Sequence, residues 1–129
     1  MHAVDTNVVI RYLTLDDAEQ SLIARAFVDG RQILVLSTVL VECEWVLRSV
    51  HRLSPSAIQT LLLEFAGLPT VTLEQPAFAV RALDWFAQGM DLADALHLAG
   101  AEECEAFATF DRKLVAAAKK AGAGKVKAL

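Results

Sequence analysis

Short apolar runs alternate with helix-like stretches along the chain, and this alternation constrains the fold more than any other feature. The clearest run is Ile33-Leu34-Val35-Leu36, which is typical of a strand buried in a parallel sheet. We expect further strands at 2–5, 71–73, 106–110 and, at a sheet edge, 125–127. Because a helix usually connects parallel strands, this order predicts an α/β fold with a central parallel sheet of four to five strands and helices on both faces.

Seven helical stretches are expected around these strands, and glycine or proline residues mark most of their ends. Gly30, Gly89 and Gly122 each follow a periodic apolar segment, as expected of residues that end a helix. Pro55 is at a favoured first-turn position, and Ser37 or Thr38 is expected to cap the helix after the buried strand. The expected helices are 7 to about 16, 19–29, 38–50, 55–66, 76–88, 91–103 and 112–121.

Size and composition fit one globular domain that spans residues 1–129. This length is close to the commonest size of single domains, and 55% of the residues are hydrophobic, above the usual share. No apolar run approaches the roughly eighteen residues of a membrane span, and no signal-peptide pattern is present, so we expect a cytoplasmic protein that binds no membrane. Cys43 and Cys104 lack the close spacing of zinc ligands and are both expected to be buried free thiols.

Acidic and basic residues are unevenly distributed. The net charge is −4, all sixteen acids lie at or before Asp111, and the segment from Arg112 to Leu129 carries six bases. An acidic surface argues against non-specific coating of nucleic acid, because binding there would lack the counterion release that usually drives it. Acids gathered in one place remain suited to bind a metal ion.

Several acids occupy positions where parallel α/β proteins usually bind their ligands, outside the carboxyl ends of the strands. Asp5 follows His2-Ala3-Val4 at the end of the first expected strand, Asp111 directly follows the strand expected at 106–110, and Asp94 lies in the first turn of its helix. Asp is also a leading helix-capping residue in proteins of any function. Taken singly, Asp5, Asp91 and Asp111 are therefore better explained as helix caps.

Asp94 and Glu42 are harder to explain by local structure. Apolar neighbours surround Asp94 on its helix, so its carboxylate is expected to be partly buried and must then be paired, protonated or metal-bound. Glu42 lies on the flank of an apolar helix face without a basic partner in sequence, although a solvated position at the rim explains it equally well. Glu44 points away from that face and is expected to be an exposed acid paired with Arg48.

Convergence of Asp5, Glu42, Asp94 and Asp111 at one sheet edge would require a cation, because carboxylates without basic partners repel one another. A hard divalent ion such as Mg²⁺ or Mn²⁺ fits, since its preferred ligands are oxygen atoms. Mg²⁺ commonly takes only one or two carboxylates directly and leaves positions for phosphate oxygens and an attacking hydroxide. The acids therefore predict a site suited to phosphodiester hydrolysis.

Together these residues form an ordered pattern that resembles a PIN domain. The pattern consists of Asp5-Thr6-Asn7, Glu42 within a helix, the segment from Asp91 to Leu96, and Thr109-Phe110-Asp111. The resemblance covers nearly the whole chain, and the segment from Val4 to Asp17 particularly resembles VapC-type toxins of prokaryotic toxin-antitoxin pairs. It implies a single PIN-like nuclease domain over residues 1–129 that cleaves RNA endonucleolytically with Mg²⁺ or Mn²⁺. It also implies a homodimer and inhibition by a cognate antitoxin protein.

The resemblance also implies roles for individual residues. Asp5 and Asp94 would be the principal metal ligands, Asp111 would complete the cluster, and Glu42 would hold metal-bound water or a second ion. Asn7 and Thr109 would hold these ligands in position without binding the metal themselves. Asp91 matches an acid often found in the family, but a capping role explains it equally well.

Two arginines, Arg11 and Arg112, are expected to contact RNA phosphates, although solvation at the surface also explains them. Arg112 is chosen because it directly follows an active-site acid at the start of a helix. His97 lies one turn after Asp94 and is expected to be a structural histidine, because water activated by a metal needs no separate base.

The main alternative is a non-catalytic PIN-like module that uses the same acids only to bind a metal or a partner. Such a module would inhibit stoichiometrically without turnover. A phosphoacceptor receiver domain is also a single α/β domain with clustered acids, but it needs adjacent acids after the first strand. Thr6 and Asn7 follow Asp5 instead, which also disfavours a phosphatase with an Asp-x-Asp nucleophile.

Overall fold

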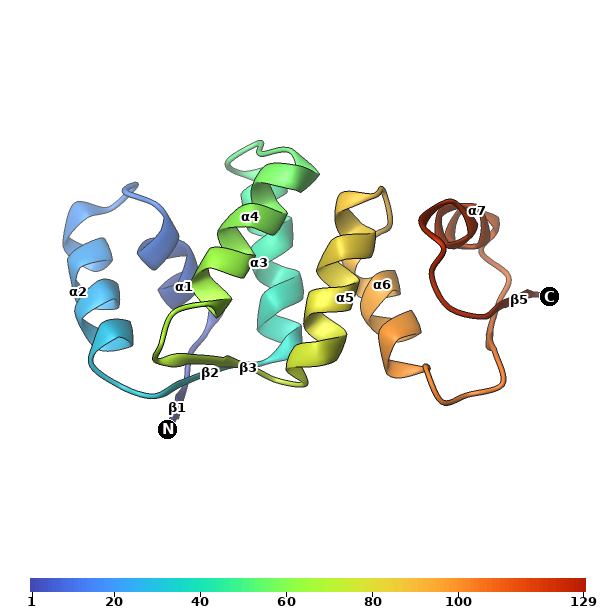
Figure 1. Cartoon of the computed structure of the whole chain (residues 1–129). Helices are drawn as coiled ribbons and strands as arrows, with labels where there is room; N and C mark the ends of the chain where they lie inside the picture. Colours follow the sequence, from blue (N-terminus) through green and yellow to red (C-terminus); the bar gives the residue numbers. More distant parts are fainter. The chain divides into compact units, whose positions relative to one another are not determined.

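The computed structural model of the protein describes residues 1–129, which form seven helices and five short strands (Figure 1). Their bounds are β1 His2–Ala3, α1 Thr6–Leu13, α2 Ala18–Asp29, β2 Ile33–Val35, α3 Ser37–Ser49, α4 Pro55–Ala66, β3 Val71–Leu73, α5 Pro76–Ala87, α6 Leu92–Gly100, β4 Phe107–Thr109, α7 Arg112–Ala121 and β5 Val126–Ala128. All strand pairs are parallel, so the predicted α/β class is confirmed. None of the helices is long and apolar enough to cross a membrane.

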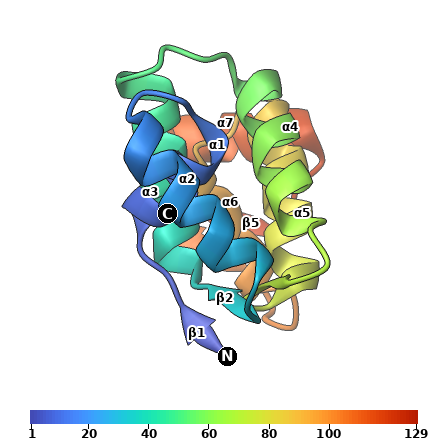
Figure 2. The same ribbon diagram turned by 90° about the vertical axis from the view of Figure 1, so that its left-hand side faces the viewer.

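The chain divides into two compact units, and the first comprises Met1–Pro76. Its strands form one parallel sheet in the order β1-β2-β3, in which Ile33 of the central strand pairs with His2 on one side and Val71 on the other. Figures 1 and 2 show these strands at one end of the four helices α1 to α4. The first unit is therefore a small sheet joined to a four-helix cluster.

The core of the first unit is built from side chains that are almost inaccessible to solvent: Val9, Val28, Ile33, Leu47, Ile58 and Leu62. They come from α1, α2, β2, α3 and α4, so each of these elements presents an apolar face to the core, as the helical spacing predicts. Burial of each large apolar side chain contributes on the order of 1.5–3 kcal/mol. This packing holds the short strands in place, since two or three residues alone form few ladder hydrogen bonds.

The second unit comprises Ala77–Leu129. Strand β4 pairs in parallel with β5, with Phe107 opposite Val126, and α7 is the crossover between them. Gly122 ends α7 in the left-handed conformation (φ 66°), which glycine adopts readily because it lacks a Cβ atom. The buried side chains of this unit include Leu83, Phe86, Leu92, Leu98 and Leu114.

The five strands are grouped differently from the predicted single sheet. Three form one sheet and two form the other, and each sheet belongs to one unit. Apolar periodicity identifies a strand but does not specify its neighbour, because pairing depends on contacts between distant segments. The strands are parallel, as predicted, but β4 and β5 do not pair with the sheet of β1, β2 and β3.

Two helices end about one turn earlier than predicted. Helix α1 ends at Leu13 and α6 at Gly100, whereas the apolar pattern suggested ends near Asp16 and Glu103. At the end of α1, the Thr14 hydroxyl donates to the Ile10 carbonyl (2.9 Å), so a side chain satisfies a terminal backbone acceptor.

The N-terminus of α3 is capped from a distance, and the expected cap by Ser37 or Thr38 is wrong. Leu36 occupies the N-cap position and makes no side-chain cap hydrogen bond. Instead the Ser37 N–H donates to Glu74 Oε1 (3.0 Å), from the residue that follows β3. The Glu74 N–H in turn donates to the Val35 carbonyl (2.9 Å), which continues the pairing of β2 and β3. Glu74 therefore joins the sheet to the start of α3.

Two side chains have the opposite burial to that predicted. Glu44 is buried (4% exposed) rather than exposed, although its predicted ion pair with Arg48 is present (2.9 Å). The guanidinium offsets the charge of this buried carboxylate. Cys43 is buried as expected, but Cys104 is exposed, because α6 ends at Gly100 and leaves Cys104 in the following turn.

We predict that Glu74→Ala lowers the free energy of unfolding by about 1 kcal/mol, because the Ser37 N–H loses its acceptor at the start of α3. Glu74→Gln keeps an oxygen at this position and should lower it less. Urea denaturation followed by circular dichroism measures both effects. Glu64→Ala, which removes an exposed acid of α4, is the control, and an equal loss in that variant would contradict the capping role.

Candidate active site

The four acids predicted for the site form two pairs, one in each compact unit. Asp5 and Glu42 belong to the first unit, and Asp94 and Asp111 belong to the second. None of the four forms an ion pair with a lysine, arginine or histidine side chain. Each pair is therefore a local concentration of negative charge.

The first pair lies around the end of β1 and the middle of α3. Asp5 is the N-cap of α1, where its Oδ1 accepts the Val8 N–H (3.2 Å), as its position after the strand predicts. Glu42 is exposed on α3, next to the buried Cys43. Burial, together with the nearby charges of Glu42 and Asp5, raises the pKa of the Cys43 thiol to about 12. Both carboxylates are therefore close to the same buried side chain.

A groove of about 640 Å³ runs beside Asp5, between α1 and α2. Ile23 and Phe27 of α2 contribute apolar surface, whereas Asp5, Asn7 and Arg11 contribute polar atoms. Ile23 is exposed, so part of this apolar surface faces solvent. The groove thus combines an apolar wall with the first carboxylate of the site.

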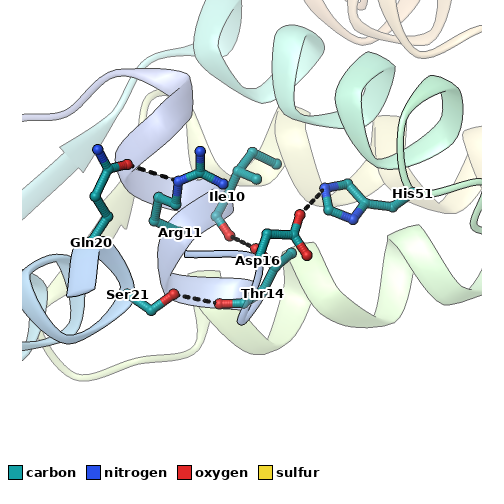
Figure 3. Close-up of polar contacts among 7 residues, drawn as sticks. All are labelled: Ile10, Arg11, Thr14, Asp16, Gln20, Ser21 and His51. Atoms are coloured by element: carbon teal, nitrogen blue, oxygen red, sulfur yellow. Dashed lines mark hydrogen bonds and ion pairs between the residues drawn. The ribbon is translucent and has the colours of Figure 1, made fainter. Parts of the chain in front are cut away.

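Arg11 is held in this groove by a neutral partner. Its Nε donates to Gln20 Oε1 across the two helices (2.9 Å; Figure 3). Because the glutamine amide carries no charge, the hydrogen bond orients the guanidinium without neutralising it. Arg11 therefore remains able to bind an anion such as a phosphate.

Polar contacts fix the connection between α1 and α2 (Figure 3). The buried Ser21 hydroxyl donates to the Thr14 carbonyl (2.8 Å). His51, after α3, lies 3.3 Å from Asp16 and forms an ion pair with it when the imidazole is protonated. The connection is thereby attached to both α2 and the end of α3.

The second pair includes Asp111, which occupies a tightly bonded turn after β4. Its Oδ1 accepts the N–H groups of Lys113 (2.9 Å) and Leu114 (3.2 Å), so Asp111 is the N-cap of α7. The Asp111 N–H donates to Thr109 Oγ1 (2.9 Å). The capping bonds use one carboxylate oxygen, so Oδ2 is left for another ligand.

Asp94, the other acid of this pair, is half-buried near the start of α6. Its N–H donates to Asp91 Oδ2 (3.1 Å), which makes Asp91 the cap of this helix. Burial raises the pKa of Asp94, the charges of Asp91 and Asp111 raise it further, and His97 opposes this shift. The second unit thus brings three carboxylates within electrostatic reach of one another.

The donor set of each pair fits a divalent cation with oxygen ligands. No three His, Cys, Asp or Glu side chains are arranged as a metal site. Mg²⁺ needs fewer, because it commonly binds through one or two carboxylates and completes its shell with water. The repulsion that raises the pKa of Asp94 is also the kind of interaction that a bound cation offsets. The acids present are therefore suited to Mg²⁺ or Mn²⁺.

Two residues near the acids were not found by sequence reasoning. Gln20 is nine positions from Arg11, and no local spacing relates a glutamine of one helix to an arginine of another. Phe110 was expected within a strand, but β4 ends at Thr109 and the Phe110 side chain is 81% exposed. The only sequence signal of its exposure was that no apolar residue continues the alternating strand pattern beyond Phe110.

His97, expected to be a structural histidine, stacks on Phe107, with ring centroids 6.0 Å apart.

We predict that Asp94→Asn stabilises the metal-free protein at neutral pH. The pKa of Asp94 is higher in the folded chain than its ordinary value of 3.8, so ionisation opposes folding. Wild-type stability should fall as the pH rises from that value through the raised pKa, whereas asparagine does not ionise. Thermal unfolding as a function of pH should show the gain at neutral pH and none below 3.8.

Glu103→Gln is the matched control, because it removes an exposed acid of the same unit. It should show no comparable gain. A lower melting temperature of Asp94→Asn at neutral pH would show that this carboxylate stabilises the fold, contrary to the prediction.

Comparison with known proteins identifies the family. The sequence model of the PIN domain matches residues 3–120, a range that includes all four acids. PIN domains are generally nucleases, hydrolases that typically use divalent metal ions. No match is found among curated proteins. With nine-tenths of its length matched, the chain belongs to the PIN domain family.

Proposed function

We propose that this PIN domain is a Mg²⁺- or Mn²⁺-dependent endoribonuclease that acts as the VapC-type toxin of a toxin-antitoxin pair. The observation that carries the proposal is the lack of a basic partner at Asp5, Glu42, Asp94 and Asp111. Three other acids of the chain, among them the buried Glu44, do have a basic partner. Unpaired carboxylates at the positions of the PIN pattern support cation binding and phosphodiester hydrolysis.

The proposed roles are those that the PIN pattern implies for each position. Asp5, Asp94 and Asp111 would hold the cation, and Glu42 would orient water or hold a second ion. When bound, the cation would polarise a phosphate oxygen and lower the pKa of water. Asn7 would support Asp5, and Thr109 would fix Asp111 through the hydrogen bond already formed with its N–H group.

Arg11 and Arg112 would bind RNA phosphates on the approach to these acids. The partner of Arg11 is the neutral Gln20, so the hydrogen bond leaves its positive charge available to a phosphate. Arg112 is exposed at the first position of α7, directly after Asp111. Both positions support attraction of a polyanion toward a site that is otherwise acidic.

The first test is cleavage of a panel of RNAs by the purified protein. We expect cleavage with Mg²⁺ or Mn²⁺ and none with EDTA. Asp5→Asn and Asp94→Asn should abolish cleavage and keep the circular dichroism spectrum of the wild type, because asparagine preserves shape and removes the charge. Persistent activity in EDTA would refute the metal mechanism.

Glu103→Gln should cleave like the wild type, since it removes an exposed acid outside the four. The alternative function is a non-catalytic module that binds a metal or a partner through the same acids. It predicts no turnover under any of these conditions, with metal binding that still depends on Asp94.

We further propose that a cognate antitoxin binds the groove between α1 and α2 and blocks access to Asp5. The groove supports this because it joins exposed apolar surface to a carboxylate of the site. A homodimer is proposed as well, because 55% of the residues are hydrophobic and large side chains such as Leu22, Trp45 and Val50 are exposed. The cytoplasm is the compartment in which such an enzyme would meet its RNA.

Ile23→Glu should weaken binding of the antitoxin, because it places a charge on the apolar wall of the groove. The measurement is copurification with the product of the adjacent reading frame after coexpression. Leu15→Glu is the control, since Leu15 is even more exposed but does not line the groove. Equal retention of the adjacent gene product by Ile23→Glu and the wild type would place the partner elsewhere.

A further inference from the structure

Phe110 has the largest exposed fraction of any large apolar side chain in the chain, at 81%. It lies in the turn between β4 and α7, immediately before Asp111. A single exposed apolar residue is common on protein surfaces and carries no functional meaning by itself. The backbone around Phe110 and the charges beside it distinguish this residue from the others.

The backbone on both sides of Phe110 is held by hydrogen bonds. On one side, Thr109 belongs to β4, and its Oγ1 accepts the Asp111 N–H (2.9 Å). On the other side, Asp111 caps α7 through two backbone N–H groups. An exposed ring on an anchored turn loses little conformational freedom when a ligand binds, which favours affinity.

Two cations that could bind phosphates follow Phe110 in the sequence, directly after Asp111. Arg112 and Lys113 follow in the first turn of α7, both are exposed, and neither forms an ion pair. The acids Glu102, Glu103 and Glu105 precede the start of β4, whereas Phe110 follows its end. An exposed aromatic ring with exposed cations two and three positions further along the chain combines the two features that bind single-stranded nucleic acid. Nucleobases stack on the ring, and basic side chains bind the phosphates.

We propose that Phe110 is a stacking platform for an unpaired base of single-stranded RNA, next to the phosphate that lies at Asp111. This inference rests on the proposed nuclease function and adds a residue that positions the substrate. A protein partner is a poorer fit, because Val80 and Leu129 are the only other large apolar side chains exposed in this unit. Three such side chains are few for the apolar centre of a stable interface.

The experiment measures binding of a fluorescein-labelled, single-stranded RNA 20-mer by anisotropy, in an Asp94→Asn background that prevents cleavage. Phe110→Ala should weaken binding roughly 5- to 150-fold, the range expected for loss of one stacked base. Phe110→Trp should restore it, because the indole ring also stacks. The same RNA as a duplex should bind all three proteins equally, since its bases are not available.

Val80→Ala in the same background is the control for loss of an exposed apolar side chain, and it should bind single-stranded RNA like its parent. Light scattering of each variant reports the mass. Unchanged binding by Phe110→Ala, equal weakening for duplex RNA, or failure of Phe110→Trp to restore binding would overturn the proposal. A change from dimer to monomer in Phe110→Ala would overturn it in favour of a protein contact.

Failure of this inference and failure of the proposed function give different results. If the wild type cleaves RNA but binding does not depend on Phe110, only the stacking role is wrong. If binding depends on Phe110 but the wild type never cleaves, only the nuclease role is wrong. Absence of any binding of single-stranded RNA by the Asp94→Asn protein would overturn the stacking role directly.

Discussion

Backbone N–H groups at the start of a helix need acceptors, and this requirement links the fold of the chain to its acidic site. Asp5 supplies the acceptor for α1, Asp91 for α6 and Asp111 for α7. The same helix ends favour the ionised form of a carboxylate. Because the bonds of Asp111 use one oxygen, a stable helix end and an available ligand atom exist in the same side chain. Structural and chemical roles are therefore not alternatives at these positions.

Much of the local structure was predictable from sequence, because its signals are local. Pro55 begins α4 and Gly122 ends α7, as predicted, so the bounds of these helices agreed closely. The grouping of strands into two sheets and the cap of α3 by Glu74 were not predictable. Both depend on which distant segments meet, a property that periodicity and turn residues do not encode.

In the candidate site, too, local features were predictable and contacts between distant segments were not. The helix-cap positions of Asp5 and Asp111 were predictable because a strand end and a helix start are visible in the sequence, and the partial burial of Asp94 followed from its apolar neighbours. Sequence did not reveal that Gln20 holds Arg11 or that Phe110 is exposed, because both facts arise from packing between elements.

The double use of the capping acids has an evolutionary consequence. A descendant that lost catalysis would still need an acceptor at positions 5, 91 and 111, so drift there would be limited to Asp, Asn, Ser or Thr, the residues that cap helices well. Glu42 and Asp94 make no side-chain hydrogen bond to a helix end and would be released from selection. Loss of function in this lineage would therefore first appear as substitutions at positions 42 and 94. The residues at 5, 91 and 111 would persist as helix caps, although they resemble active-site residues most.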